Sequence, residues 1–478
     1  MSTPKNRASI DMTKGNAFGL LLRFSLPLIA GNALQQLYNM VDSVVVGQFV
    51  SHTALAAVGI AFPVIFLLAS LFMGLGMGAM VMVSQFYGAG DKTNLRNTID
   101  TVYTALLVGG IPLSVIGALL ARPVLTLLNV PADTEAEAWL YLVIVLGGLL
   151  GSLGYNLNAG ILQGIGDSRT PLLFLTIACL LNIVLDLLLV LVIPLGVAGV
   201  AIATIVAQFF SWIFGIFWIN KKYPELTIRP FSFNFNKKLF VQIIRLGLPA
   251  GVQNALFSVG ALMMTRLVNS FGSAFAAGWN AANKIDTFAF LPIQSITNAM
   301  MTYSGQNIGA GKLARVKHGT RASLLMCTVV ALLGLLVMPI GPYLMRMFTD
   351  DPTVVDAGMA FIYRIMPFYW MLGINFSLNN TMRGAGEAMV PMISSLVGLW
   401  LARVPAAYLL AEHFGAANLN FCYAIGWVVG LCITIPYYLS GRWKNKSVTR
   451  AGNNPDAEAA AADRPDLDIT ASDEMPPS

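Results

Sequence analysis

Long apolar runs recur along nearly the whole chain and are separated by short polar segments. A membrane-spanning helix needs about 20 predominantly apolar residues, and these runs meet that length. The pattern therefore predicts an all-α polytopic membrane protein. We expect twelve transmembrane helices, at residues 17–46, 54–85, 97–120, 136–163, 170–193, 196–220, 239–270, 275–305, 316–345, 355–382, 389–412 and 417–441.

Composition supports this class, because 56% of the residues are hydrophobic, only 11% are charged, and the mean hydropathy is +0.70. These values exclude an ordinary soluble domain. The cysteines lie inside the apolar runs without the spacing of metal ligands, so we expect core packing and no structural metal. They are Cys179, Cys327, Cys422 and Cys432.

Most of the 29 basic residues lie at the N-terminus, in every second loop and after the last span. Cytoplasmic loops carry an excess of Lys and Arg, so both termini are expected in the cytoplasm of a multi-pass protein of the bacterial inner (plasma) membrane. The net charge of +6 follows from this topology. No nucleic-acid partner is indicated.

Three sequence motifs recur at an offset of about 220 residues, so six spans form one repeat. An even number of spans gives both halves the same orientation, which predicts two pseudo-symmetric lobes and alternating access between them. We expect an N-terminal lobe (1–222), a cytoplasmic inter-lobe loop (223–238), a C-terminal lobe (239–443) and a disordered polar tail (444–478). The paired motifs are Arg23-Phe-Ser-Leu-Pro27 and Arg245-Leu-Gly-Leu-Pro249, Gln85 with Gly88-Ala89-Gly90 and Gln306 with Gly309-Ala310-Gly311, and Gly164-Ile-Gly166-Asp167 and Gly384-Ala-Gly386-Glu387.

Two acids lie well inside predicted spans of the first lobe. Asp42 follows Gln35 and Tyr38 on one helical face, and Asp186 lies one turn after Asn182. An ionisable residue in a span usually marks an ion or substrate path. Two carboxylates that meet in a dry cavity must share a proton or a cation, which predicts a coupling-ion site. The alternative is a buried Asp whose hydrogen bonds are satisfied by the protein.

The second lobe does not repeat these acids, since Met264 and Ala406 stand at the corresponding positions. It carries other intramembrane charges. Lys284 and Asp286 are two residues apart and point to different faces, so each needs a partner from another span. Lys284 could meet an acid of the first lobe, and Arg403 is expected to bond to the backbone or to a Glu near a span end.

The chain resembles the multidrug and toxic compound extrusion (MATE) family, in its DinF- and MepA-like branch, over residues 18–441. The resemblance rests on the repeated motifs above together with Leu26-Pro27-Leu28-Ile29 before Asp42 and Gly47, with Asn182-x-x-x-Asp186, and with Gly196-x-x-Gly199-x-x-x-Ala203-Thr204. It implies a multidrug efflux antiporter that exports bulky, often cationic, amphipathic compounds in exchange for H⁺ or Na⁺, with a role in antibiotic resistance.

The family's first-lobe cation site falls on Asp42, Asn182, Asp186 and Thr204, with Asn158 or Asn156 from the fourth span. Na⁺ at Asp42 and Asp186 is one form of this site. Members with an acidic second-lobe site carry a Glu in span seven, where Phe257 stands here. Coupling is therefore expected to rest on the first lobe alone.

The expected substrate path is lined by flexible methionines and a few polar residues of early spans in both lobes. Lipid-facing filler is the alternative for the methionines. We expect no cofactor besides the coupling ion, no partners besides small amphipathic substrates and the lipid bilayer, and a monomer. The candidate substrate contacts are Gln35, Tyr38, Asn254, Asn280, Met73 and Met263.

Other functions fit less well. The loop Gly309-Ala-Gly311-Lys312 lacks the first Gly and the Ser or Thr of a phosphate-binding loop, and no catalytic constellation stands out, so we expect a secondary transporter and not an enzyme. A lipid or lipid-linked oligosaccharide flippase would need several basic residues in its cleft, whereas few lie deep. A non-transporting membrane receptor remains the lesser alternative, and it would bind ligand without a gradient.

Overall fold

The structure is a computed structural model that describes residues 9–128 and 130–449, and every regular element within these ranges is a helix. In the first half these are α1 (Ala17–Phe49), α2 (His52–Ala89), α3 (Lys92–Leu127), α4 (Ala132–Gly147), α5 (Leu149–Gly164), α6 (Arg169–Leu187), η1 (Leu188–Val192) and α7 (Val197–Lys222). In the second half these are α8 (Lys237–Asn269), α9 (Ser273–Gly309), α10 (Leu313–Gly334), α11 (Val337–Arg346), α12 (Pro352–Ile365), η2 (Met366–Phe368), α13 (Tyr369–Gly384), α14 (Met389–Leu396), η3 (Val397–Arg403), α15 (Val404–Phe414), η4 (Ala416–Phe421), α16 (Cys422–Leu439) and η5 (Arg442–Lys446).

The helices build the twelve expected crossings, several of which are broken. Within the described ranges, ten helical segments are long and apolar enough to cross a membrane, and the pair α4 and α5, bent by 47°, makes an eleventh. The remaining crossing is α9. It carries Asn280, Lys284 and Asp286, and the polar side chains of its last helical turns are buried. The all-α membrane fold with two six-helix lobes is thereby confirmed.

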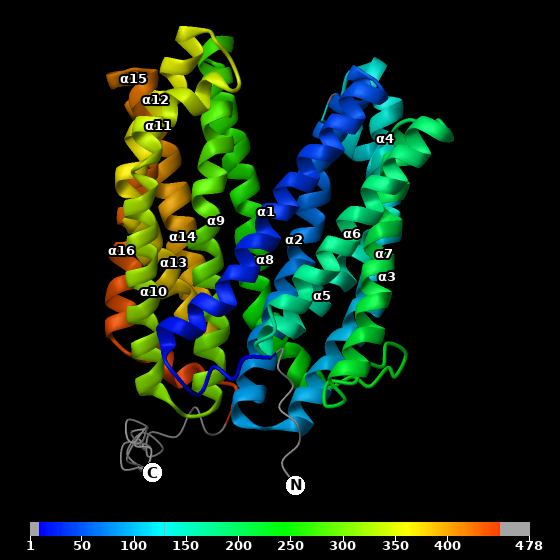
Figure 1. The fold of residues 1–478 in the computed structure, drawn as a ribbon, viewed down its shortest axis with the longest axis vertical. Coiled ribbons are helices and arrows are strands. Elements are labelled where there is room, and N and C mark those ends of the chain that lie inside the picture. The colour runs from blue at the N-terminus through cyan, green and yellow to red at the C-terminus, as the bar shows by residue number, and fades with distance from the viewer. Residues whose placement is uncertain (1–8, 129, 450–478) are drawn as a thin grey trace, which may run out of the picture.

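Two hydrophobic cores correspond to the two lobes. One contains side chains from α2 to α7, and the other contains side chains from α9 to α16. Figure 1 shows that the lobes converge at the end where α1 begins and η5 lies, and diverge toward the opposite end.

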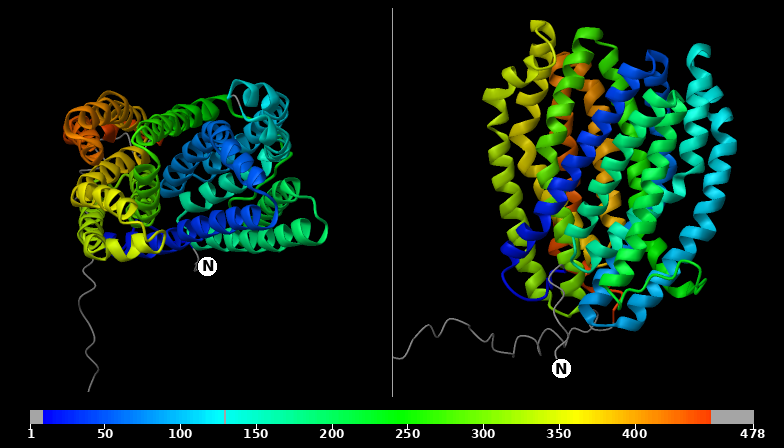
Figure 2. Two further views of the ribbon diagram at one scale, coloured as in Figure 1. Left: turned by 90° about the horizontal axis from the view of Figure 1, so that it is seen from above. Right: turned by 45° about the vertical axis from the view of Figure 1, so that its right-hand side comes forward.

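The first helix of each half packs on both lobes. Leu21 and Phe24 in the first half of α1 belong to the core of the second lobe, whereas Val45 and Val46 near its end belong to the core of the first. α8 does the reverse, with Ile243 in the first core and the segment that ends at Val268 in the second. Figure 2 (left) shows these two helices on opposite sides, each running from one lobe to the other.

The lobes meet along α2 and α8, whose backbones touch. A Cβ on Gly74 would lie 2.5 Å from the carbonyl oxygen of Gly247, and one on Gly247 would lie 2.2 Å from that of Gly74. Real Cβ atoms do not approach that closely, so only glycine fits this contact. We call the inter-lobe contact of α2 with α8 and α9 the seam.

Two glutamines at repeat-related positions bond across the seam at the end where the lobes converge. The Nε2 of Gln85 in the first lobe donates to the carbonyl of Gly384 at 2.8 Å, and the Nε2 of Gln306 in the second donates to that of Gly164 at 3.0 Å. Backbone groups near the ends of the described chain donate to the other atom of each amide. Gln85 Oε1 accepts from Val448 N at 2.9 Å, and Gln306 Oε1 accepts from Met12 N at 3.0 Å. Both ends of the described chain therefore bond to the glutamines that join the two lobes.

The third repeated motif caps helices. Gly166 has φ +91° and Gly386 φ +100°, a backbone that favours glycine. The following acids accept from the next helix, as when Asp167 Oδ1 accepts from Thr170 N at 3.0 Å and Glu387 Oε1 accepts from Met389 N at 3.0 Å. Tyr223 donates to Asp167 at 2.6 Å, and burial together with that carboxylate raises the pKa of the phenol, so it keeps its proton.

The polar tail begins later than expected. Residues 444–449 were assigned to it, but η5 covers Arg442–Lys446, Trp443 is buried, and Ser447 Oγ donates to Gln85 Oε1 at 3.0 Å. Polar residues here bond to a buried glutamine instead of to water, and composition alone does not reveal that partner. The rest of the expected tail, 450–478, lies outside the described residues.

The seam predicts a sharp difference between two neighbouring glycines. Gly74→Ala places a methyl group against the backbone of α8, so it should destabilise the folded protein by about 1–3 kcal/mol. Gly76→Ala is the matched control, because its Cβ meets nothing within 4 Å. Thermal unfolding of both purified variants measures this, and equal midpoints would contradict the tight seam.

Candidate functional site

The two first-lobe acids meet. Asp42 lies on α1 and Asp186 on α6, which pack against each other, and the two carboxyl groups lie near enough to interact electrostatically. Asp186 is fully buried and Asp42 is half-buried. In each carboxyl group Oδ1 is shielded from solvent, and no group among the described residues hydrogen-bonds to it. We call these two side chains the acid pair.

Polar groups from α1, α6 and one further helix, α7, surround the acid pair. In the amide orientation that satisfies its neighbours, Asn182 donates to Asp186 Oδ2 at 3.0 Å and accepts from the backbone N of Thr204 at 3.1 Å. The hydroxyl of Tyr38 lies 3.5 Å from Thr204 Oγ1. Asn182, one turn before Asp186 on α6, and Thr204 on the neighbouring α7 thereby fix the position of Asp186.

Tyr141 of α4 also lies beside the acid pair, since its phenol interacts electrostatically with both carboxyls, and it is buried. Sequence reasoning missed it. Tyr141 lies in an ordinary apolar run of the sequence. Its hydroxyl group is the one feature that could have suggested a polar role, and only the fold shows that α4 packs beside the acid pair.

This arrangement can hold one positive charge. Two carboxylates so close in a low-dielectric site repel each other, so the stable states are a shared proton or a bound cation. The surrounding oxygen atoms of carboxyl, amide and hydroxyl groups are the hard donors that alkali and alkaline-earth ions prefer. The orphan Oδ1 atoms of Asp42 and Asp186 are where either species fits.

Asn158 lies elsewhere, so the structure does not bring it to the acid pair. Its Nδ2 donates to the carbonyl of Trp212 at 3.0 Å, and its Oδ1 accepts from the hydroxyl of Tyr103. The alternative Asn156 donates to the carbonyl of Ser152, one turn back in its own helix. Asn158 is fully buried and tied between helices, which is a packing role.

The candidate substrate contacts are dispersed. Tyr38 turns to Thr204 and so belongs with the acid pair, and Gln35 Nε2 lies 3.5 Å from Asn39 Oδ1 on the same face of α1. Asn254 and Met263 are half-buried, whereas Asn280 and Met73 are exposed. None of these six residues lines the second-lobe cavity that contains Asp286 and Arg403.

The second-lobe charges have aromatic partners. Asp286 accepts a hydrogen bond from the hydroxyl of Tyr369, and the guanidinium of Arg403 lies 3.4 Å from the ring centroid of Tyr423. The expectation that Arg403 bonds to the backbone or to a Glu is wrong for the described residues, because it stacks on a ring instead. Lys284 is exposed, 5.8 Å from the ring centroid of Phe348, and no ion pair joins it to a described acid.

The bonding of Asn158 predicts a structural phenotype. Asn158→Ala leaves the buried Tyr103 hydroxyl without its acceptor and removes one hydrogen bond to the Trp212 carbonyl, which should cost about 1–3 kcal/mol of folding stability. We expect a lower midpoint of thermal unfolding, with ion dependence of transport unchanged in the folded fraction. A shift in ion dependence would return Asn158 to the coupling site.

Comparison with known proteins identifies the family. The MatE family model matches residues 27–188 and 249–409, one segment in each lobe. The chain is 31% identical to the probable multidrug resistance protein YpnP of Bacillus subtilis over 438 residues, which cover 91% of this chain and 97% of that relative. It is 28% identical to the probable multidrug resistance protein NorM of Thermotoga maritima, with 90% and 93% covered.

Among solved structures, the outward-facing conformation of a multidrug resistance MATE family transporter of the MOP superfamily superposes with a TM-score of 0.85. That chain is 21% identical, and the match covers 92% of this chain and 98% of that one, so it supports the fold. The lobes, the acid pair and the matched segments lead to one conclusion. The chain belongs to the MatE family of multidrug and toxic compound extrusion transporters.

Proposed function

We propose that this chain is an antiporter that couples the inward movement of H⁺ or Na⁺ to the export of bulky amphipathic organic compounds. As a member of this family it is a transporter and not an enzyme. The observation that carries the coupling proposal is the acid pair, whose two buried oxygen atoms have no partner in the protein. The relatives' names, probable multidrug resistance proteins, support the substrate class.

The position of Asp42 on α1 provides a route from ion binding to lobe movement. The second half of α1, which carries Asp42, packs in the first lobe, and the first half packs in the second lobe. A cation or proton in the acid pair draws Asp42 and Asp186 together by removing their repulsion. That movement of α1 relative to α6 acts on both lobes, because one helix contacts both.

The closed end of the molecule supports alternating access. The lobes are bonded together at the end where α1 begins and diverge at the other end (Figure 1). With the bonded end in the cytoplasm of a bacterial inner membrane, as the distribution of basic residues favours, the lobes diverge toward the outside. A bound compound would leave from this state, and an ion would enter the acid pair.

The acid pair predicts loss of coupling when titration is removed. Asp42→Asn and Asp186→Asn keep the shape of each side chain but cannot hold a proton or a negative charge, so each should reduce ethidium efflux at least tenfold. The measurement uses proteoliposomes with an imposed proton gradient and, separately, an imposed Na⁺ gradient. Whichever gradient drives wild-type efflux identifies the ion.

Asp133→Asn is the matched control, since that residue is exposed at the start of α4. It should transport as the wild type does. Wild-type efflux rates in both acid-pair variants, at equal amounts of folded protein, would refute coupling through this site.

The seam glutamines predict a shift in conformation. Replacing both Gln85 and Gln306 by Ala removes two hydrogen bonds between the lobes and three from Met12, Ser447 and Val448, so the lobes should separate at this end more often. Spin labels on Thr93→Cys and Lys317→Cys, in a background without native cysteines, should report longer distances by pulsed electron resonance. Gln48→Ala, at an exposed position, serves as control, and an unchanged distribution would exclude the glutamines as a gate.

A further inference from the structure

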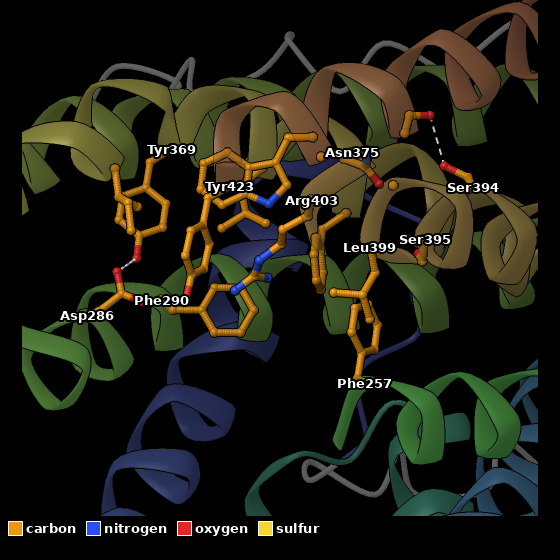
Figure 3. A pocket seen from close by; sticks show the side chains of 17 residues that line it. Phe257, Asp286, Phe290, Tyr369, Asn375, Ser394, Ser395, Leu399, Arg403 and Tyr423 are labelled. Atoms are coloured by element: carbon orange, nitrogen blue, oxygen red, sulfur yellow. Dashed lines mark hydrogen bonds between the residues drawn. The ribbon is translucent and has the colours of Figure 1, made fainter. Parts of the chain in front are cut away.

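A second polar cavity lies inside the second lobe, away from the acid pair. It has a volume of about 220 Å³, is partly open, and is lined by α8, α9, α12, α13, α14, α16 and the segment η3. Figure 3 shows Asp286 and Arg403 from different helices, with Tyr369 and Tyr423 between them. Neither charge contributes to the coupling site proposed above.

Arg403 has an incomplete set of partners. Its Nε is shielded from solvent without an acceptor, and within the described residues no carboxylate or carbonyl accepts from its guanidinium. Its close contacts are the Tyr423 side chain, with the ring 3.4 Å away, and the Cys422 thiol, which is a weak acceptor. A guanidinium has five donors in a fork that matches a carboxylate, so Arg403 lacks its usual partner.

Asp286 is near enough to Arg403 to interact electrostatically, but no ion pair joins them in the described chain. Its carboxyl accepts from the Tyr369 hydroxyl instead. Intramembrane charges are costly unless they pair, and here the two opposite charges stand apart on different helices of one cavity. A ligand that carries both charges would complete each of them.

The rest of the cavity wall is aromatic. Phe257, Phe290 and Trp427 line it along with the two tyrosines, and Trp427 stacks on Tyr369 with a centroid distance of 6.0 Å. Flat apolar walls between two separated charges favour a planar ring with an ionic group at each end.

We propose that this cavity binds a small aromatic zwitterion, with its anionic group on Arg403 and its cationic group on Asp286. The ring of the ligand lies among Phe257, Phe290 and Trp427. The proposal goes beyond the coupling function, since it assigns a ligand class to a site without Asp42 or Asp186.

The test compares three probes that share one ring. Isothermal titration of the purified full-length protein in detergent uses 4-(aminomethyl)benzoate, which carries both charges, and then benzoate and benzylamine, which carry one each. We expect the zwitterion to bind at least tenfold more tightly than either single-charge probe. Equal affinity for benzylamine or benzoate would overturn the proposal, as would the absence of saturable binding.

Variants assign the two ends. Arg403→Gln should reduce the affinity for the zwitterion at least tenfold and leave that for benzylamine unchanged, whereas Asp286→Asn should spare benzoate. Arg364→Gln is the matched control, because this second basic residue of the same lobe already donates to Asn418 Oδ1 at 2.9 Å and lies outside the cavity. An equal loss in Arg364→Gln would refute the assignment.

A third variant protects the test against misfolding. Ser395→Leu narrows the cavity without removing either charge, and it should weaken binding of all three probes together. Asp42→Asn should bind the zwitterion as the wild type does. If no probe binds in this cavity, the coupling proposal is unaffected. If the acid-pair variants transport normally, the binding proposal is unaffected. Unchanged binding in Ser395→Leu would place the probes elsewhere.

Discussion

Backbone contact between the lobes is the constraint on which this structure depends. Gly74 and Gly247 let α2 and α8 approach until a single Cβ would overlap a carbonyl oxygen. In a bilayer there is little hydrophobic force between helices, so close packing and interhelical hydrogen bonds must hold two lobes together. A seam of small residues provides the packing, and Gln85 and Gln306 provide the bonds. Such a contact has few interlocked side chains, so two lobes can separate along it.

The contacts between the lobes explain why the repeated motifs are recognisable in the sequence. The glutamine motif of one lobe bonds to the Gly-x-Gly-acid motif of the other, so each repeat supplies half of two crossed contacts. Repetition, span number and lobe division could be predicted from sequence, because apolar length and offset are explicit in it. The hydrogen bonds between the motifs could not be predicted. Their acceptors are the backbone carbonyls of Gly164 and Gly384, and every residue has such a carbonyl, so the sequence does not mark these two.

The candidate site was predictable to a similar depth. Helical spacing placed Asn182 with Asp186, and the cost of burying an acid pointed to Asp42. Periodicity within one helix cannot say which neighbour a side chain faces. The family resemblance placed Asn158 at the site, although it bonds to Tyr103 and Trp212, and periodicity gave no sign of Tyr141.

The two lobes share a scaffold but differ in chemistry, and this difference matters for transport. Repeat-related residues supply the glutamine bonds across the seam and the helix caps. The intramembrane charges do not match: the first lobe holds two acids that interact with each other, and the second holds Asp286 and Arg403 without an ion pair between them among the described residues. An ion that binds the acid pair changes the net charge of one lobe only. In the proposed antiport mechanism, only the first lobe therefore responds directly to the ion that enters, and α1 transmits that response because it packs on both lobes.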